Sequence, residues 1–278
     1  MKTIKGIWRF SRVICYTFVC LFQAYTRFKH VDRKEKGRML RYYPTQVLKL
    51  AGVRCSYEGH VPELLHECGL TDTPPACLVL SNHVSWLDIF SLDSQLPSRF
   101  IAKAEIAKWP IFGLIAQQIG TLFINRSSKR AILRINDDIR GALCNCEAVT
   151  IFAEGTTTFG NELLPIKANF IAPACEIGAT VQPVILSYKN KGKPTKQAAF
   201  SGDVTLFGSL WNVVTMEDAE VVVHFLEPIT NTKDLTRNEV AKICEERRRA
   251  KLEEIWGDEY IANDANAAEA LAKAIANG

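Results

Sequence analysis

Several signatures of common enzyme classes are absent from this sequence. It has no Gly-x-Ser-x-Gly motif, the turn that presents the nucleophilic serine of α/β hydrolases. Its one closely spaced cysteine pair, Cys144-Asn145-Cys146, has neither the spacing nor the neighbouring histidines of a zinc site. The nine cysteines are an odd number scattered along the chain, and several lie in apolar runs. These features argue against a zinc site and a disulfide framework, and they favour reduced thiols in a cytosolic environment.

The chain also lacks a flexible linker and a large charge excess. No stretch rich in Pro, Gly and Ser divides its 278 residues, which favours one main folded domain. A composition of 47% hydrophobic and 23% charged residues is typical of a packed core and argues against disorder. The net charge of +4 predicts mild attraction to anionic surfaces, either membrane lipid or nucleic acid.

Nucleic acid is the less favoured of these two partners. The most basic stretch near the C-terminus, residues 245–254, mixes both signs of charge at helical spacing. Such a pattern is typical of a solvated helix carrying ion pairs, and no nucleic-acid-binding motif accompanies it. We therefore expect no nucleic-acid partner.

A long uncharged hydrophobic run is missing from the N-terminal region, although the region is rich in apolar residues. The charge-free stretch between Arg12 and Arg27 has fourteen residues, whereas a helix that spans the bilayer core needs about 20. Snorkelling of Arg9 and Arg12 could still permit crossing. Apolar residues nevertheless recur at helical spacing, as one stripe made of Ile7, Phe10, Ile14, Phe18, Leu21, Tyr25 and Phe28. The pattern predicts a helix that lies in the membrane interface.

Basic residues continue directly after this stripe, at Arg33, Lys34, Lys36, Arg38 and Arg41, where they would meet anionic headgroups. Two alternatives are a signal peptide, which lacks a small-x-small cleavage site here, and a core helix of a soluble bundle. We favour residues 1–51 as a membrane-associated helical segment that docks on the cytoplasmic face of a membrane, the inner membrane if the source is bacterial.

From residue 53 onward, short apolar runs alternate with helical stretches, which predicts an α/β fold with a mixed, mainly parallel sheet flanked by helices. The predicted strands are Val53 to Tyr57, Cys77 to Leu80, Arg99 to Ala102, Thr121 to Asn125, Val149 to Ala153, Val181 to Leu186 and Glu220 to Leu226. The predicted helices are Leu87 to Gln95, Lys129 to Cys144 and Ala168 to Ile177. Residues 261–278 are rich in alanine and are expected to form a weak helix or a mobile tail.

The heptapeptide that runs from Asn82 to Asp88 carries the clearest chemical signal. It places His83 and Asp88 five residues apart, directly after the predicted strand Cys77 to Leu80. A strand followed by the first turn of a helix folds the chain back, so the carboxylate can meet the imidazole and fix its tautomer. By itself this spacing also fits a polar pair in a loop or a helix cap.

Two further apolar runs end in polar residues, at Phe123-Ile124-Asn125-Arg126 and at Ile151-Phe152-Ala153-Glu154-Gly155-Thr156. In open α/β sheets, ligands bind outside the carboxyl ends of the strands. We therefore expect these segments to converge on one cleft with the heptapeptide.

In this order the blocks resemble the 1-acylglycerol-3-phosphate acyltransferase superfamily. Its signature is Asn-His-x-x-x-x-Asp, then Phe-x-x-Arg, Glu-Gly-Thr and a proline block. These correspond here to His83 with Asp88, Phe123 to Arg126, Glu154 to Thr156, and Gln182-Pro183-Val184. The resemblance covers about residues 52–228 and implies an acyltransferase domain over residues 52–260.

The resemblance implies a role for each matching residue. His83 would act as the general base on the free hydroxyl of a lysolipid, and Asp88 would hold the ring. Arg126 would bind an anionic head group through its planar guanidinium. The other residues implied in substrate binding are Asn82, Lys103, Glu154, Gly155, Thr156 and Lys167. No cofactor is implied, because the acyl-CoA or acyl carrier protein thioester is a co-substrate. Backbone N–H groups near residues 154–156 are candidates for stabilising the oxyanion.

One residue departs from the family pattern. The usual Pro-Glu-Gly-Thr-Arg is replaced by Ala153-Glu154-Gly155-Thr156-Thr157, which removes a guanidinium where phosphate would be recognised. The acceptor could therefore be lysophosphatidate or another lyso-lipid: lysophosphatidylcholine, lysophosphatidylethanolamine or lyso-ornithine lipid. A hydrolase, or a membrane protein that binds lysolipid without turnover, remains as an alternative class. The ordinary roles of Arg126 as an ion-pair partner, Glu154 as a helix cap and Gly155 as a turn glycine also remain open.

Overall fold

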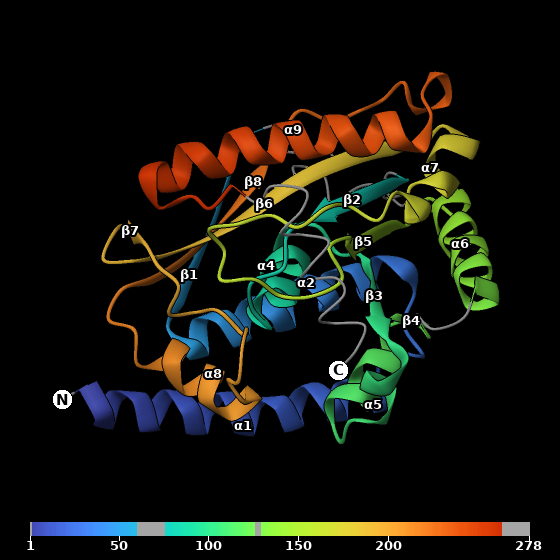
Figure 1. The fold of residues 1–278 in the computed structure, drawn as a ribbon. Helices are drawn as coiled ribbons and strands as arrows, with labels where there is room; N and C mark the ends of the chain where they lie inside the picture. Colours follow the sequence, from blue (N-terminus) through green and yellow to red (C-terminus); the bar gives the residue numbers. More distant parts are fainter. Residues whose placement is uncertain (1, 60–75, 126–128, 263–278) are drawn as a thin grey trace.

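The computed structural model describes residues 2–59, 76–125 and 129–262. Within these residues the chain forms one eight-stranded sheet with helices on both faces (Figure 1). The strands are β1 (Val53–Gly59), β2 (Cys77–Ser81), β3 (Arg99–Lys103), β4 (Leu122–Ile124), β5 (Ala148–Phe152), β6 (Thr180–Asn190), β7 (Lys193–Pro194) and β8 (Ala219–Phe225). The seven predicted strands all form, and the short β7 is additional.

The strand order is β1-β8-β6-β2-β5-β3-β4, with β7 paired to β6. The β8 and β7 strands run antiparallel to β6, and every other pairing is parallel. This arrangement confirms the prediction of a mixed, mainly parallel sheet flanked by helices.

The central strands are apolar because both of their faces are covered. Every residue of β2 and β5 is buried, as expected for parallel strands between two helical layers. Alternate side chains enter different cores: Leu78 and Leu80 pack with one cluster, whereas Cys77 and Val79 pack with the other.

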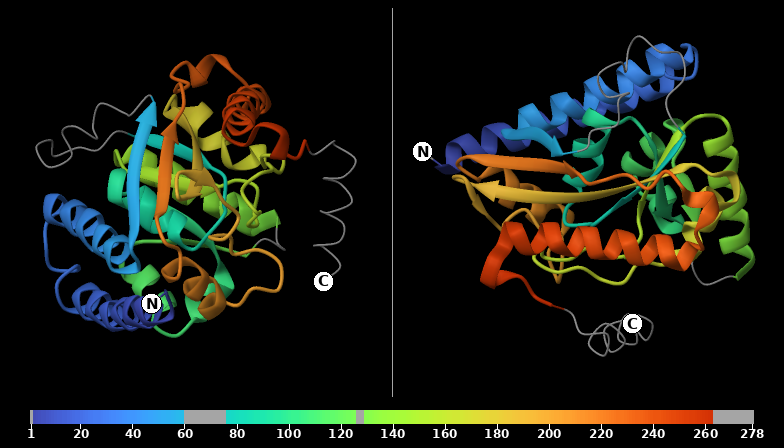
Figure 2. Two further views of the ribbon diagram at one scale, coloured as in Figure 1. Left: turned by 90° about the vertical axis from the view of Figure 1, so that its left-hand side faces the viewer. Right: turned by 90° about the horizontal axis from the view of Figure 1, so that it is seen from above.

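The helices divide between the two faces of the sheet (Figures 1 and 2). On one face lie α6, α7 and α9, and on the other lie α1, α2, α4 and α8. The helices are α1 (Lys2–Thr26), α2 (Arg33–Ala51), α4 (Leu87–Gln95), α5 (Phe112–Gln118), α6 (Lys129–Cys144), α7 (Ala172–Ile177), α8 (Leu206–Val214) and α9 (Arg237–Trp256). Short 3-10 turns are η1 (Ala104–Lys108), η2 (Ala168–Phe170), η3 (Thr232–Asp234) and η4 (Gly257–Glu259).

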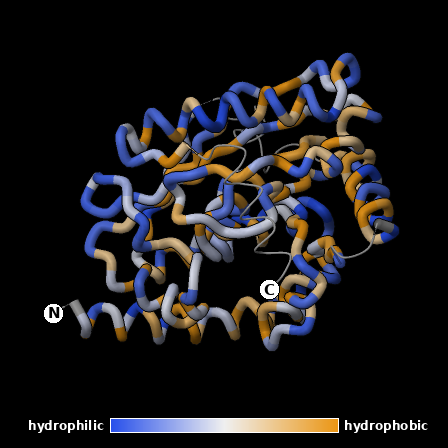
Figure 3. The backbone as a smooth tube through the Cα atoms, viewed as in Figure 1, coloured by the Kyte–Doolittle hydropathy of each residue, from blue (hydrophilic) through white to orange (hydrophobic). Residues whose placement is uncertain are grey.

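Two predicted helices differ from the structure. The segment predicted as one helix from Ala168 to Ile177 is divided into η2 and α7, with Pro173 in the first turn of α7. The solvated C-terminal helix is longer than the stretch that predicted it, and it is hydrophilic over much of its length (Figure 3). Its inner face is nevertheless buried, and Arg248 lies on that face.

The N-terminal helix α1 packs through part of the predicted apolar stripe, at Phe10 and Ile14, and also through residues outside it. Arg9, which lies outside the stripe, is buried, and its Nη1 donates to Val214 O and Met216 O at 3.0 Å each. Several members of the stripe, including Ile7 and Phe18, are exposed instead. The carbonyls at the end of α8 explain the difference, because they need donors that an apolar side chain lacks.

The second helix, α2, uses part of the predicted basic cluster within the molecule. Arg33 Nη2 donates to Asn145 O at 2.7 Å and to Cys146 O at 2.8 Å, and Arg41 Nη2 donates to Gln95 O at 2.9 Å. The helix ends at Gly52, whose φ is +76°.

None of the helices in the described part of the chain has an apolar stretch long enough to cross a bilayer. The alanine-rich tail that was predicted for residues 261–278 lies almost wholly outside the described residues, which end at residue 262.

Candidate active site

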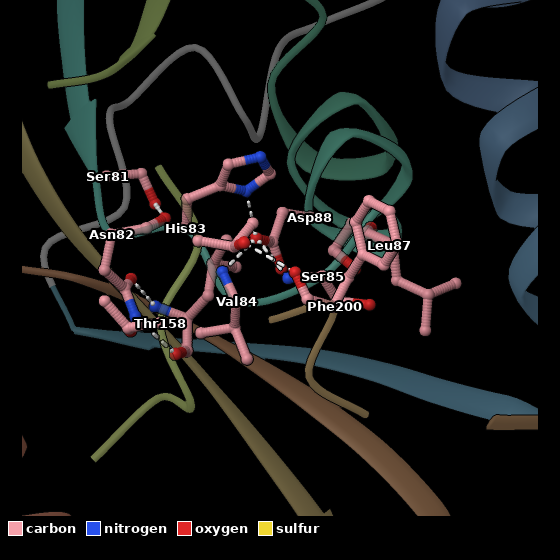
Figure 4. A network of polar contacts seen from close by, with 12 residues as sticks. Ser81, Asn82, His83, Val84, Ser85, Leu87, Asp88, Thr158 and Phe200 are labelled. Carbon is pink, nitrogen blue, oxygen red and sulfur yellow. Dashed lines mark hydrogen bonds and ion pairs between the residues drawn. The ribbon is translucent and has the colours of Figure 1, made fainter. Parts of the chain in front are cut away.

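The loop between β2 and α4 brings His83 and Asp88 into contact. The strand ends at Ser81, and the helix begins at Leu87, so Asp88 lies in its first turn. His83 Nδ1 lies 2.7 Å from Asp88 Oδ2 (Figure 4). An ionised carboxylate can only accept, so the imidazole carries its proton on Nδ1 and leaves Nε2 as a proton acceptor.

The Asp88 carboxylate is fully buried and accepts four hydrogen bonds. The backbone N–H groups of Val84 and Ser85 donate to Oδ2 at 2.7 and 2.9 Å, in addition to the bond from His83 (Figure 4). The hydroxyl of Tyr188 on β6 donates to Oδ1 at 2.6 Å. These donors fix the carboxylate, and the carboxylate in turn fixes the imidazole.

The plane of the His83 ring is set by a second contact. The ring stacks on Phe152 at the end of β5, with 4.0 Å between ring centroids and 12° between planes. The His83 side chain is 23% exposed, whereas Asp88 is inaccessible. His83 therefore presents an oriented nitrogen at a surface that a substrate can reach.

Asn82 has a structural position in the loop. Its side-chain amide donates to Leu186 O at 3.0 Å and accepts from Leu186 N at 2.7 Å. Asn82 is fully buried, and both amide atoms are engaged with β6. It fixes the start of the loop on the neighbouring strand, directly before His83.

Glu154 follows β5 and forms an ion pair with Arg248 of α9. Both side chains are almost completely buried. Burial raises the pKa of Glu154 to about 6, while the neighbouring Arg248 guanidinium acts in the opposite direction. A positive charge on His83 would lower this pKa as well, and both residues line the same cavity.

The turn at residues 155–158 is joined to the His83 loop. Gly155 adopts a φ of +85°, and its N–H donates to Phe152 O at 3.0 Å. Thr158 N donates to His83 O at 2.9 Å. Thr157, which stands where the family has arginine, donates its hydroxyl to Phe200 O at 2.5 Å. The turn and the loop therefore form one rigid unit.

A cavity of about 1690 Å³ opens beside these residues. His83, Glu154, Gly155, Thr156, Lys103 and Lys167 all line it, so the structure brings six of the nine predicted site residues to one space. Asn82 and Asp88 support His83 from behind. Arg126 lies outside the described residues.

Most of the cavity wall is apolar. It runs between α1, α2, α4 and α5, and its apolar lining includes Phe28, Met39, Val47, Trp86, Ile89, Phe90, Phe100 and Ile115. Ligand pockets are commonly about 300–1,000 Å³, so this space is large enough for more than one ligand segment.

Sequence reasoning missed two residues that support the site, Tyr188 and Arg248. Tyr188 is 100 residues from Asp88, and no local spacing connects the two. Arg248 had a signal, because Cys244, Arg248, Leu252 and Trp256 recur every four residues and share the buried face of α9. An arginine on such a face indicates a buried anionic partner.

Comparison with known proteins supports the family. The family model described as Acyltransferase matches residues 62–187. A 1-acyl-sn-glycerol-3-phosphate acyltransferase of Neisseria gonorrhoeae is 42% identical over 154 residues, which are 55% of this chain and 60% of that protein. The chain thus spans less than two thirds of that relative.

Lyso-ornithine lipid O-acyltransferases are matched over more of their length. The protein of Pseudomonas aeruginosa is 39% identical over 63% of this chain and 67% of its own length. That of Rhizobium meliloti is 32% identical over 80% of this chain and 77% of its own.

The fold has a solved counterpart in the crystal structure of the 1-acyl-sn-glycerophosphate (LPA) acyltransferase, PlsC, from Thermotoga maritima. The TM-score is 0.65 at 19% identity, and the match covers 92% of this chain and 98% of that one. Because the fold, the ordered motifs and the curated relatives agree, this chain belongs to the acyltransferase family that includes 1-acyl-sn-glycerol-3-phosphate and lyso-ornithine lipid acyltransferases.

Proposed function

We propose that the protein moves an acyl chain from an acyl thioester to the free hydroxyl of a lysophospholipid, converting 1-acylglycerol-3-phosphate to phosphatidic acid. The observation that carries this proposal is the contact of 2.7 Å between His83 Nδ1 and the buried Asp88 carboxylate at the edge of a large apolar cavity. His83 is the general base, and Asp88 holds it in the tautomer that this role requires.

The reaction proceeds in two steps without a covalent acyl-enzyme. His83 Nε2 takes the proton of the acceptor hydroxyl as that oxygen attacks the thioester carbonyl. The tetrahedral intermediate then collapses, the carbon–sulfur bond breaks, and the leaving thiolate takes the proton from the imidazolium. The Gly155 N–H already donates to Phe152 O. We therefore propose that the next backbone N–H groups, those of Thr156 and Thr157, donate to the oxyanion.

The cavity suits the hydrocarbon part of the substrates. An acyl chain gains about 0.8 kcal/mol for each CH₂ group that it buries, and the wall offers apolar side chains from four helices. Either acyl-CoA or acyl carrier protein could supply such a chain. Lys103 and Lys167 are both exposed and line the cavity, where their positive charge would attract an anionic part of the donor or the acceptor.

A second acceptor, lyso-ornithine lipid, is supported by Thr157. A threonine whose hydroxyl is engaged by Phe200 O cannot provide the forked pair of donors that an arginine offers to a phosphate. Relatives named lyso-ornithine lipid O-acyltransferases also match over 67% and 77% of their length. With either acceptor, lysophosphatidate or lyso-ornithine lipid, we propose that Arg126 binds an anionic group of the substrate.

The assignment is tested with purified protein, palmitoyl-CoA or palmitoyl-acyl carrier protein, and a panel of lyso-lipids. We expect transfer by the wild type and a loss of at least about 10³-fold for His83→Ala. Free fatty acid release would indicate hydrolysis instead. Lipid binding without turnover by either protein would indicate a passive binding protein. Lys242→Ala, an exposed change on α9 outside the proposed membrane segment, is the control and should keep the wild-type activity.

We also propose that residues 1–51 form a membrane-associated segment and residues 52–260 the catalytic domain, with the protein on the cytoplasmic face of a membrane. The support is a set of exposed apolar side chains on α1, on α8, and on α5 with the segment before it. In Figure 1 these elements lie along one side of the molecule. This apolar face consists of Ile4, Ile7, Trp8, Phe18, Val19, Phe22, Tyr25, Trp109, Phe112, Leu114, Phe207 and Trp211.

A further inference from the structure

Asp93 is a buried acidic residue that the reaction described above does not use. It lies near the end of α4, and only 2% of its surface is exposed. Its Oδ1 accepts from Ser98 N at 3.0 Å, whereas no hydrogen bond to Oδ2 occurs among the described residues. Asp93 also lines the cavity, so its second carboxyl oxygen can meet a polar group of a ligand there.

The position of Asp93 places it along the hydrocarbon part of the cavity. It shares one face of α4 with Trp86, Ile89 and Phe90, at the spacing of successive helical turns, and all four line the cavity. Asp88, which holds His83, is five residues earlier, so Asp93 lies roughly 7–8 Å further along the helix axis. A chain that starts at His83 and follows α4 therefore passes Asp93.

The chemistry of this carboxyl group differs from that of a charged side chain. Burial raises the pKa of Asp93 well above its ordinary value, and no basic side chain contributes to the shift. Burial therefore favours the neutral carboxylic acid, which can both donate and accept a hydrogen bond. A hydroxyl has the same two capacities, so the two groups are complementary.

Other polar atoms on the cavity wall are also unmatched. Gln23 Oε1 on α1 and Trp86 Nε1 before α4 are buried without hydrogen bonds in the described part of the chain, and both residues line the cavity. A wall built only for plain hydrocarbon would leave these groups without partners, at a cost in free energy.

We propose that Asp93 forms a polar subsite within the hydrocarbon cavity and binds a hydroxyl substituent on a fatty chain. The hydroxyl can belong to the acyl chain of the donor or to the chain of the acceptor. This inference rests on the proposed acyltransferase function and names a chain class for it, which is a fatty chain hydroxylated away from its carbonyl.

The test compares plain chains with chains that carry one hydroxyl, moved stepwise from the carbonyl to mid-chain. One arm uses hydroxylated palmitoyl-CoA with a plain lyso-lipid, and the other uses plain palmitoyl-CoA with a lyso-lipid whose chain is hydroxylated. The wild type is expected to favour the hydroxylated chain in at least one arm. In Asp93→Leu this preference is expected to fall on the order of tenfold, because the hydroxyl is then buried without a partner.

Two further variants separate recognition from support of the fold. Asp93→Asn retains an acceptor for Ser98 N and a polar atom in the cavity, so it should keep most of the preference. Ile89→Val, on the same helical face, changes volume without changing polarity and should alter plain and hydroxylated chains alike. An unchanged preference in Asp93→Leu, or no preference in either wild-type arm, would overturn the proposal.

A binding measurement distinguishes this failure from failure of the acyltransferase assignment. Thermal stabilisation by hydroxylated and plain palmitate requires no turnover. If transfer is absent but the wild type is stabilised more by hydroxypalmitate and Asp93→Leu is not, the subsite stands and the proposed reaction fails. If transfer occurs with the same preference in both proteins, the reaction stands and the subsite fails.

Discussion

At the level of single residues, Tyr188 reaches the candidate site from a distant part of the chain. Tyr188 lies on β6, outside the His83 loop, and its hydroxyl donates to Asp88 Oδ1 at 2.6 Å. Burial, and next the negative charge of Asp88, raise the pKa of Tyr188 well above its ordinary value. The hydroxyl is therefore always protonated and always available as a donor.

Replacing Tyr188 with Phe removes this hydrogen bond and keeps the ring. We expect the free energy of unfolding to fall by about 2 kcal/mol, since a hydrogen bond to a charged group contributes about 1.5–3 kcal/mol. We also expect kcat to fall about tenfold with little change in KM, because the Asp88 carboxylate that orients His83 is held less firmly. Urea denaturation and steady-state kinetics measure the two effects.

The matched control is Tyr57→Phe, which removes the hydroxyl of a tyrosine that is 45% exposed on β1. It should change neither quantity. An unaltered kcat in Tyr188→Phe would mean that the three donors in the loop suffice to hold Asp88.

His224 on β8 is a second buried group with an altered titration. It is 3% exposed, with Nε2 at 2.8 Å from Ser187 Oγ and Nδ1 at 3.1 Å from Glu58 Oε1. Burial lowers the pKa of His224 to about 4, and the positive charges of Lys251 and Lys189 add to this effect. The ring is thus neutral in the folded chain at pH 7.

Because the unfolded chain binds this proton at pH 6.5 and the folded chain only near pH 4, stability is lost as the pH falls between these values. The loss attributable to His224 approaches about 3 kcal/mol below pH 4, and above pH 6.5 it vanishes. His224→Gln should therefore lose less stability than the wild type between pH 6.5 and 4 in urea denaturation series. His30→Gln, an exposed histidine, should follow the wild type; equal pH slopes for all three proteins would refute the assignment.

The contact between His83 and Asp88 could be expected from sequence because it is local. The five-residue separation, the strand before it and the helix after it determine which side chains can meet. The contacts of Tyr188 with Asp88 and of Arg248 with Glu154 span 100 and 94 residues. They depend on the strand order and on where α9 crosses the sheet, and neither quantity is encoded in local spacing.

At the scale of elements, the strands were predictable because a parallel strand covered on both faces must be apolar throughout, as β2 and β5 are. The orientation of α1 could not be predicted from the sequence. A helix that is apolar over most of its circumference does not reveal which side faces the protein, and here Arg9 helps to determine it through the carbonyls at the end of α8.

Arg9→Leu should therefore loosen α1 from α8 although it makes the helix more apolar. Two buried hydrogen bonds from a guanidinium are lost, and carbonyl groups of Val214 and Met216 lose their donor. We expect unfolding to require about 2–4 kcal/mol less, and amide hydrogen exchange in α1 to accelerate. Gly52→Ala should act similarly, since its new Cβ would lie too close to the Arg9 guanidinium.

Arg12→Leu provides the control for charge. Arg12 stacks on Trp8 at 4.1 Å from the ring centroid on the more accessible part of the same helix. This variant loses the same positive charge but no buried hydrogen bond, so exchange in α1 should remain slow. Equal acceleration in both variants would mean that the charge of α1, and not its bonds to α8, keeps it in place.

At the scale of the whole molecule, the hydrocarbon cavity and the apolar face adjoin each other through α1 and α5. These helices contribute Cys20, Ala24 and Ile115 to the cavity wall, and Phe22 and Leu114 to the apolar face. Fatty substrates reside in membranes, so a protein whose cavity helices also contact lipid would shorten the path from the bilayer to His83.

The proposed membrane contact can be tested by making the apolar face polar at one point on each helix. The triple variant Phe22→Ser, Leu114→Ser and Phe207→Ser alters side chains that are exposed and do not line the cavity. Each of the three apolar side chains could contribute about 1 kcal/mol or more when it inserts into the membrane interface. Partition of the triple variant onto anionic phospholipid vesicles, measured by co-sedimentation, should therefore fall by more than about tenfold. Leu133→Ser changes an exposed apolar residue on the distant α6, and this variant should bind vesicles as the wild type does (Figure 1).

Activity toward lyso-lipid dispersed in detergent should persist in the triple variant, since the cavity is intact. Undiminished vesicle binding by that variant would exclude this face as the membrane contact.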